Sequence, residues 1–233
     1  MALRIRRNKK GYDQLLLRLA ALAAMALYVS GALKGFSPLV HDGVGRFSFT
    51  VFAWMLAEGY EKSGDRYVYA RRLLLFALLA EVPYDLLNFG YYVSSRGQNS
   101  LFTLLAALCS FWIIDVLKEK ADNSVLSIII DLAVFAAAVT VAGITSMEGG
   151  MMGMICAFAF HISFSLSYPK LFQTAVILPC AAVFCPGEAL FIAAAVLLCW
   201  GYNGSRGSNA LALRYLFYAA YPLTLLICWL VKN

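Results

Sequence analysis

Most of the chain is divided into apolar stretches long enough to cross a bilayer, and this pattern restricts the fold more than any other feature. A membrane-spanning helix needs about 20 predominantly apolar residues. Because lipid cannot hydrogen-bond to a backbone, we predict an all-α, polytopic transmembrane helix bundle of eight or nine spans. The seventh and eighth stretches can also form one re-entrant hairpin. The predicted spans cover residues 14–33, 45–60, 70–92, 101–117, 124–143, 151–167, 169–184, 188–201 and 214–231.

The composition excludes an ordinary soluble domain. Of the 233 residues, 62% are hydrophobic and 14% are charged, whereas soluble domains average about 45–50% apolar and about 25% charged residues. The six cysteines form no CxxC pair and lie in or beside apolar stretches, which favours packed small hydrophobes over a disulfide framework. No metal site is predicted. No repeat or linker interrupts the pattern, so residues 1–233 are predicted to form a single integral membrane domain.

The basic residues predict the orientation in the membrane. When the nine spans alternate from an inner N-terminus, 14 basic residues fall in inner segments and 4 in outer segments. Cytoplasmic loops carry such an excess, so a multi-pass protein of the inner membrane with a cytoplasmic N-terminus is predicted. We interpret the first basic cluster as a topogenic signal rather than a nucleic-acid-binding arm; it consists of Arg4, Arg6, Arg7, Lys9 and Lys10.

Charged residues inside the second and third spans are the strongest indication of a functional site. Arg46 opens the second span, while Glu81 and Asp85 lie four residues apart in the third, on one helical face. A charge in hydrocarbon costs a few kcal/mol, so such residues are retained for a function or a partner. Pro83 lies between the two acids and predicts a helix interrupted at a site. We predict that Glu81, Asp85 and Arg46 form a catalytic or amine-binding group; a structural Arg–carboxylate pair is the alternative.

Further polar residues are predicted to lie at both ends of the spans. Asn203 and Arg206 belong to a glycine-rich inner loop, NGSRG, whose backbone amides and arginine could hold a phosphate; an ordinary turn is the alternative. Of the two histidines, His41 is predicted in an outer loop and His161 in a Phe-rich span, where a packed, hydrogen-bonded side chain is predicted. The predicted substrate-binding residues are Glu58, Arg71, Arg72, Gln98, Asn99, Asn203, Arg206 and Tyr221.

Four motifs, spread in order over nearly the whole chain, resemble the TraX family. They are GRFSFTVFAWMLAEGY (45–60), LLLFALLAEVPYDLL (73–87), QNSLFTLL (98–105), and YNGSRG followed by RYLFYAAYPL (202–223). The named member of this conjugation-related family acetylates the amino terminus of F-type pilin. The resemblance implies a multi-spanning acyltransferase that takes acetyl-CoA or another acyl-CoA as a co-substrate, with no bound cofactor. It also implies contact with membrane lipid and an acceptor that is a peptide, a pilin-like protein or a small molecule.

The chain departs from the family at positions that usually carry histidine. Tyr28 and Val29 stand where the family has Asp-His in the first span, and Thr224 stands where it has histidine in the last. Valine cannot accept a proton, so Glu81 or Asp85 is the expected base, with Arg46, Asn99 or Tyr28 as oxyanion donors. The expected activity is transfer of an acyl group to an amine or hydroxyl. The alternatives are a degenerate relative that binds a peptide or lipid without transfer, and a small-solute transporter.

Overall fold

The protein is all-helical. The computed structural model describes residues 11–31, 35, 37–121, 123–205 and 211–232, and of residues 211–214 the backbone alone. Among these residues there is no strand, and the nine helices are α1 (Gln14–Ser30), α2 (Pro38–Glu61), α3 (Arg66–Phe89), α4 (Ser100–Lys118), α5 (Ser124–Ile144), α6 (Gly150–Ser163), α7 (Pro169–Phe184), α8 (Ala189–Trp200) and α9 (Leu211–Lys232).

Local side-chain chemistry sets several helix ends. Asp65 accepts a hydrogen bond from the Val68 amide at 2.9 Å at the start of α3, and Asn123 caps α5 in the same way. Gly90 ends α3 with φ 77°, a left-handed conformation that favours glycine. These caps explain why the predicted helix boundaries lie close to the observed ones.

Two proline effects differ from the sequence-based prediction. Residues 38–44 were expected in a loop, but Pro38 is the first residue of α2, where its fixed φ and missing N–H suit a helix start. Pro83 was expected to interrupt the third span, yet α3 continues through it to Phe89. One proline removes a single backbone donor, and neighbouring helices can compensate for it in an apolar bundle.

Three of the helices are long and apolar enough to cross a membrane. They are α4, α5 and the segment Tyr215–Lys232 of α9, and α1, α6, α7 and α8 are shorter apolar helices. The outer faces of the long helices are apolar and uncovered: on α5, Ile128 is 58% exposed and Leu132 62% exposed. Such faces are stable against hydrocarbon and not against water, so the fold is that of a membrane protein.

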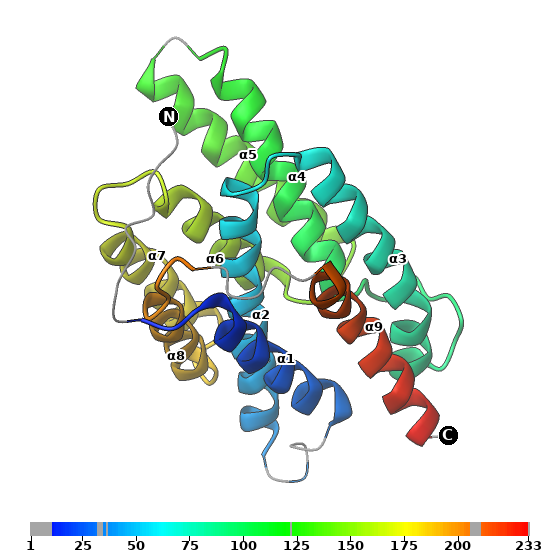
Figure 1. Ribbon diagram of the computed structural model, residues 1–233. Helices are drawn as coiled ribbons and strands as arrows, with labels where there is room; N and C mark the ends of the chain where they lie inside the picture. The colour runs from blue at the N-terminus through cyan, green and yellow to red at the C-terminus, as the bar shows by residue number, and fades with distance from the viewer. Residues whose placement is uncertain (1–10, 32–34, 36, 122, 206–210, 233) are drawn as a thin grey trace.

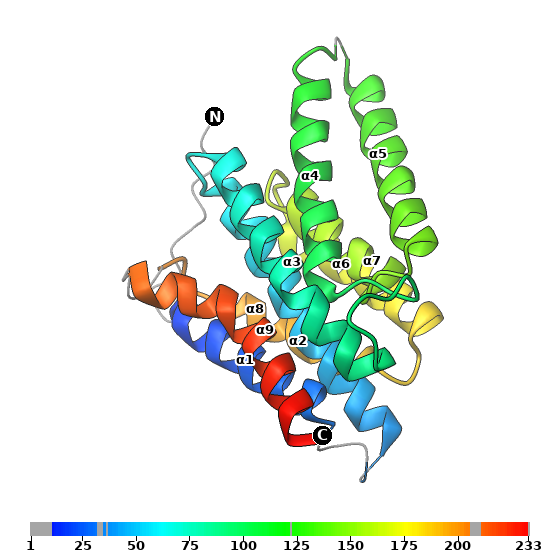
Figure 2. The same ribbon diagram turned by 90° about the vertical axis from the view of Figure 1, so that its right-hand side faces the viewer.

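Helix α2 lies at the centre of the molecule (Figure 1). It packs against α1, α4, α6 and α8. A closed ring of contacts runs from α1 to α2, α4, α3, α9 and back to α1. Helices α5, α6, α7 and α8 lie outside this ring. Figure 2 shows α4 and α5 side by side as a hairpin that extends beyond the other helices.

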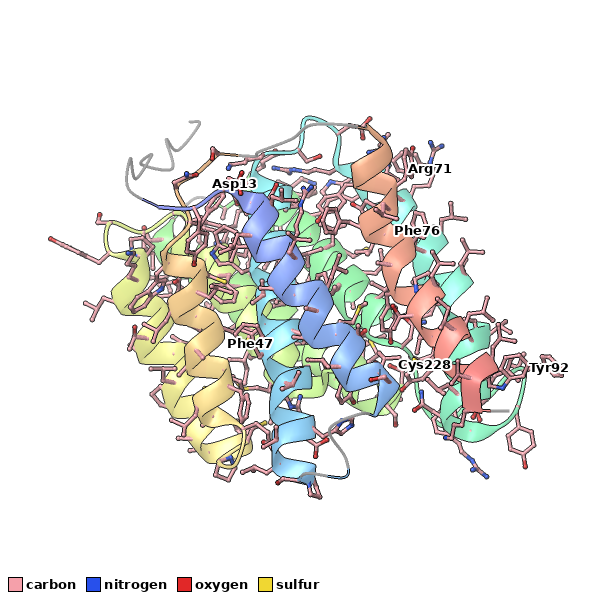
Figure 3. The ribbon with its side chains drawn as sticks, turned by 60° about the horizontal axis from the view of Figure 1, so that its bottom comes forward. Asp13, Phe47, Arg71, Phe76, Tyr92 and Cys228 are labelled. Atoms are coloured by element: carbon pink, nitrogen blue, oxygen red, sulfur yellow. The ribbon has the colours of Figure 1, made fainter. Side chains whose placement is uncertain are left out.

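Loops at the same end of the molecule are joined to each other. The Tyr12 amide donates to the Gly201 carbonyl at 3.2 Å, and the Asn203 amide donates to the Tyr12 carbonyl at 2.9 Å. At the other end the Gln98 amide donates to the Ser146 carbonyl at 3.3 Å. Figure 3 shows the two ends: Asp13 and Arg71 lie at one and Tyr92 at the other. We call the first the basic end, after the lysines and arginines predicted to be cytoplasmic.

The joint between the N-terminal segment and the loop before α9 can be tested with one methyl group. A Cβ on Gly11 would lie 2.1 Å from the Gly201 carbonyl oxygen, whereas a Cβ on Gly143 in α5 meets nothing within 4 Å. Gly11→Ala should therefore lower the unfolding free energy by about 1–3 kcal/mol through overpacking. Gly143→Ala should raise it by up to about 1 kcal/mol through helix propensity. Thermal unfolding in detergent measures both, and equal midpoints for the two variants would contradict the described joint.

Candidate functional site

A cavity of about 650 Å³ lies inside the ring formed by α1, α2, α3, α4 and α9. Residues of α2 line it from Asp42 to Glu58 and Gly59, and Lys62 just beyond the helix continues the wall. Those 20 residue steps correspond to about 30 Å along a helix axis. The cavity therefore extends along most of α2 and connects the polar groups at the two ends of that helix.

At the basic end, a fully buried carboxylate organises the cavity wall. Glu58 is 0% exposed, accepts a hydrogen bond from Gln14 Nε2 at 2.8 Å, and forms an ion pair with Lys62 one turn later. Gln14 in turn accepts a hydrogen bond from Arg18 at 2.8 Å. A buried charge needs such a partner and such hydrogen bonds to be tolerated. This network joins α1 to the end of α2.

Three cationic side chains line the cavity at this end. They are Arg18, Lys62 and Arg72, which come from α1, the end of α2 and α3. Each lies over an aromatic ring: Arg18 is 4.8 Å from the Phe217 centroid, Lys62 5.2 Å from Tyr202, and Arg72 5.8 Å from Tyr215. Guanidinium and ammonium groups beside aromatic rings are suited to bind phosphates and stacked bases.

The middle of the cavity is apolar. Its walls carry Met25 from α1, Phe52 and Met55 from α2, and Leu101 and Leu104 from α4. Methionine side chains adapt to ligands of irregular shape. This apolar waist separates the cationic end from a second polar region.

The second polar region is built around Glu148, in the loop between α5 and α6. Its carboxylate accepts hydrogen bonds from Tyr28 at 3.1 Å and from Tyr221 at 2.9 Å, so α1 and α9 both hold it. Arg46 lies beside it and donates to the Gly149 carbonyl at 3.2 Å. Arg46, Tyr28, Tyr221 and Glu148 all line the cavity.

The loop that carries Glu148 is fixed by its backbone. The Glu148 carbonyl accepts a hydrogen bond from Thr103, and its amide donates to the Gln98 carbonyl at 2.8 Å. Gly149 has φ 94°, which a residue with a side chain rarely adopts. Burial raises the pKa of the Glu148 carboxyl, while hydrogen bonds from Tyr221 and Tyr28 act in the opposite direction. A carboxylate with a raised pKa inside a cavity is suited to take up a proton.

Glu81 and Asp85, which were predicted to be catalytic, hold a loop instead of lining the cavity. Glu81 accepts hydrogen bonds from Asn99, at 2.5 Å from its side-chain amide and 3.3 Å from its backbone amide. Asp85 accepts a hydrogen bond from the Ser94 amide at 2.6 Å. Both carboxylates thus anchor residues 90–99 against α3. Among the described residues, Arg46 forms no ion pair with Glu81 or Asp85, so the alternative prediction of a structural Arg–carboxylate pair is not seen either. The Arg46 side chain instead donates to the Gly149 carbonyl.

The predicted substrate-binding residues divide into two groups. Glu58, Arg72 and Tyr221 line the cavity, as Arg46 does. Arg71, Gln98, Asn99 and Asn203 lie outside its lining. Asn203 instead donates to the Gly11 carbonyl at 2.9 Å and accepts from Ser205, so the glycine-rich loop clamps the N-terminal segment. Arg206 lies outside the described residues.

The remaining sequence-based expectations concern histidine. His161 is buried and stacks on Phe111 at 4.1 Å, which confirms the predicted packing, but its Nδ1 makes none of the predicted hydrogen bonds among the described residues. His41 is buried in α2 and stacks on Tyr28 at 4.7 Å, although a loop position was predicted. At the positions where the TraX family has histidine, Val29 packs in an apolar cluster and Thr224 bonds to the Ala220 carbonyl at 2.7 Å.

In the sequence, Glu148 lies in the loop between the predicted spans 124–143 and 151–167, and no role is predicted for it. One signal was available: Glu148 is the only acidic residue between Asp131 and Glu188, and two glycines follow it directly. An isolated acid in so apolar a region needs partners from other helices. The sequence cannot show that these partners are tyrosines of α1 and α9.

The Glu58 network predicts a large difference between two glutamates at the basic end. Glu58→Ala should lower the unfolding free energy by about 2–3 kcal/mol, because hydrogen bonds to a buried charge are lost. Glu119→Ala removes an exposed carboxylate just after α4 and should change it by less than about 0.5 kcal/mol. Denaturation in detergent compares the two, and a similar loss in both would show that Glu58 is not organising this wall.

Comparison with family models identifies the family of the chain, whereas comparison with individual proteins finds no match. No curated protein and no solved structure is similar enough to the chain to count as a match. The family model described as TraX protein matches residues 14–232, nearly the whole chain. The chain therefore belongs to the TraX family.

Proposed function

We propose that the protein is a multi-pass acyltransferase of the inner membrane that moves an acetyl or longer acyl group from acyl-CoA to an amine. One observation carries the proposal: a single cavity joins a cationic end to an end with a buried carboxylate and an arginine. Membership in the TraX family favours the same chemistry.

The donor would bind at the basic end, which faces the cytoplasm if the positive-inside rule holds. Arg18 and Arg72 would contact the phosphates of CoA, because charge-assisted hydrogen bonds to phosphate are among the strongest in proteins; Lys62 is already paired with Glu58. The pantetheine arm would extend through the apolar waist. Its thioester would then approach Arg46, which lies about 18 Å from Glu58 along α2 by helix rise.

The acceptor would bind at the Glu148 end. Three carboxylates line this region, from Asp42, Glu148 and Glu188, against the one guanidinium of Arg46. An excess of negative charge favours a protonated amine over a neutral hydroxyl. A peptide, a pilin-like protein or a small amine would each satisfy this requirement, and membrane lipid would surround the bundle.

The side chains around the thioester would divide the reaction between them. Glu148 would first take one proton from the bound ammonium group, and the neutral amine nitrogen would then attack the carbonyl carbon. Arg46 would stabilise the oxyanion of the tetrahedral intermediate, while the Tyr28 and Tyr221 hydroxyls, which donate to Glu148, would hold that carboxylate in place. Collapse of that intermediate breaks the C–S bond and releases CoA as a thiolate, which takes up the second proton that the nitrogen loses as the amide forms. Glu148 replaces Glu81 and Asp85 as the proposed base because it lines the cavity and they do not.

The missing histidines support a second candidate, a relative that binds without transfer. Val29 and Thr224 cannot act as strong bases, and Thr224 is already bonded to the backbone of its own helix. Such a protein would bind an acyl-CoA or a peptide in the same cavity. Binding without turnover in the experiment below would favour this candidate, and solute uptake into proteoliposomes would favour a transporter.

The proposed base can be tested against the base expected from sequence. Purified protein receives labelled acetyl-CoA and a peptide with a free amino terminus, and donor binding and turnover are measured. Glu148→Gln should lower turnover by about 10²–10⁴-fold, the usual contribution of a general base, with donor binding retained. Glu81→Gln should keep turnover within a few-fold, because an amide can still contact Asn99. Absence of both binding and turnover in the unsubstituted protein would sink the acyltransferase proposal.

The proposed donor site can be tested with neighbouring arginines. Arg72 lines the cavity, whereas Arg71 lies over Tyr67 at 6.0 Å and outside the lining. Arg72→Ala should weaken acetyl-CoA binding by about 10-fold or more, the value of one charge-assisted phosphate contact. Arg71→Ala should have little effect. The truncated donor S-acetylpantetheine has no phosphate, so its binding should not distinguish the two variants. An equal loss for both donors would place the phosphates elsewhere.

A further inference from the structure

A second cavity, of about 330 Å³, lies at the basic end between α2, α4, α5 and α6. It shares no lining residue with the larger cavity. Its walls are polar and carry three carboxylates, one lysine and one histidine: Glu61, Asp115, Asp131, Lys118 and His161. None of these residues has a role in the proposed acyl transfer.

The charges around this cavity do not balance. Asp115 pairs with Arg66 at 2.8 Å and accepts a hydrogen bond from Tyr60 at 2.7 Å. Asp131 pairs through Oδ2 with Lys118 at 2.6 Å. The third carboxylate, Glu61, lies 3.3 Å from His161 Nδ1 and forms an ion pair only when that imidazole is protonated. With a neutral imidazole the cavity has one negative charge in excess.

Two buried polar atoms in the cavity wall make no hydrogen bond among the described residues. They are Asp131 Oδ1 and His161 Nδ1. His161 is 8% exposed, and its ring is fixed by stacking on Phe111 at 4.1 Å and by an edge contact with Tyr60 at 5.4 Å. Glu61 Oε1 lies 3.3 Å from Nδ1, outside hydrogen-bonding geometry. A buried polar atom without a partner costs about 1–3 kcal/mol, which a bound ligand can recover.

We propose that this second cavity binds a primary ammonium group. An –NH₃⁺ group has three N–H donors. The cavity offers three acceptors, namely Asp131 Oδ1, the Glu61 carboxylate and His161 Nδ1 when its proton is on Nε2. The positive charge of the ligand offsets the excess carboxylate, and the volume admits a small alkylamine. This site is independent of acyl transfer and lies at the end predicted to face the cytoplasm.

The histidines provide a site-specific measurement, because the chain contains only two. The full chain, purified without a histidine tag and labelled with ¹⁵N-histidine, is titrated with ethylammonium chloride in mildly alkaline buffer at constant ionic strength. His161→Gln assigns the resonances. Ethylammonium should shift the His161 Nδ1 resonance in a saturable way and leave His41 unchanged. Tetramethylammonium, which has no N–H donor, and potassium should shift neither.

Variants decide whether the named acceptors form the site. Glu61→Gln should weaken ethylammonium binding by 10-fold or more, and Asp131→Asn should do the same if it folds. Glu119→Gln, an exposed acid near the same end, is the matched control and should bind as the unsubstituted chain does. The proposal is overturned if tetramethylammonium or potassium reproduces the His161 shift, if only His41 responds, or if Glu61→Gln binds ethylammonium unchanged.

Discussion

A charge inside an apolar bundle must have a partner, and this requirement explains where the polar residues of the protein lie. Glu58 is paired with Lys62 and hydrogen-bonded to Gln14, and Asp131 is paired with Lys118. Glu148 accepts two tyrosine hydroxyls from different helices. Since dispersion alone is weak at specifying which apolar helices pack together, these polar contacts select the neighbours of each helix. The Gln14–Glu58 and Lys118–Asp131 contacts join consecutive helices, whereas Glu148 joins its loop to α1 and α9, which are distant in the chain.

The helical elements were predictable because their signals are local. Apolar length, caps such as Asp65 and Asn123, and the glycine at position 90 each act within a few residues. Pro38 and Pro83 show where such rules fail. The same residue type starts one helix and is tolerated inside another, and the surrounding bundle decides which outcome holds. Among the described residues, three helices are long and apolar enough to cross a membrane. The predicted count of eight or nine spans depends also on four shorter apolar helices and on α2 and α3, which are long but belong to neither group.

The candidate site was predictable only in part, because it is made of long-range contacts. Arg46, Glu58, Arg72 and Tyr221, which were among the predicted site residues, line the cavity. Glu81 and Asp85 were predicted at a depth similar to that of Arg46, yet their carboxylates accept hydrogen bonds from the amides of Ser94 and Asn99. The depth of a residue in a predicted span therefore does not show which way its side chain points. A loop that follows a span offers unpaired amides, and a nearby carboxylate can satisfy them more cheaply than it can remain unpaired in a cavity.

The apolar waist explains why one helix can serve both ends of the proposed reaction. Arg46 and Glu58 are fixed to the same rigid helix, so the distance between the donor and acceptor ends is set by helix rise. Apolar residues such as Phe52 and Met55 line the cavity between them, and in the proposed reaction they would keep water away from the acyl group. In such a dry region the Arg46 charge acts on a developing oxyanion with little screening. The same dryness would limit hydrolysis of the thioester, because water could approach it only through a mouth that the donor or the acceptor occupies.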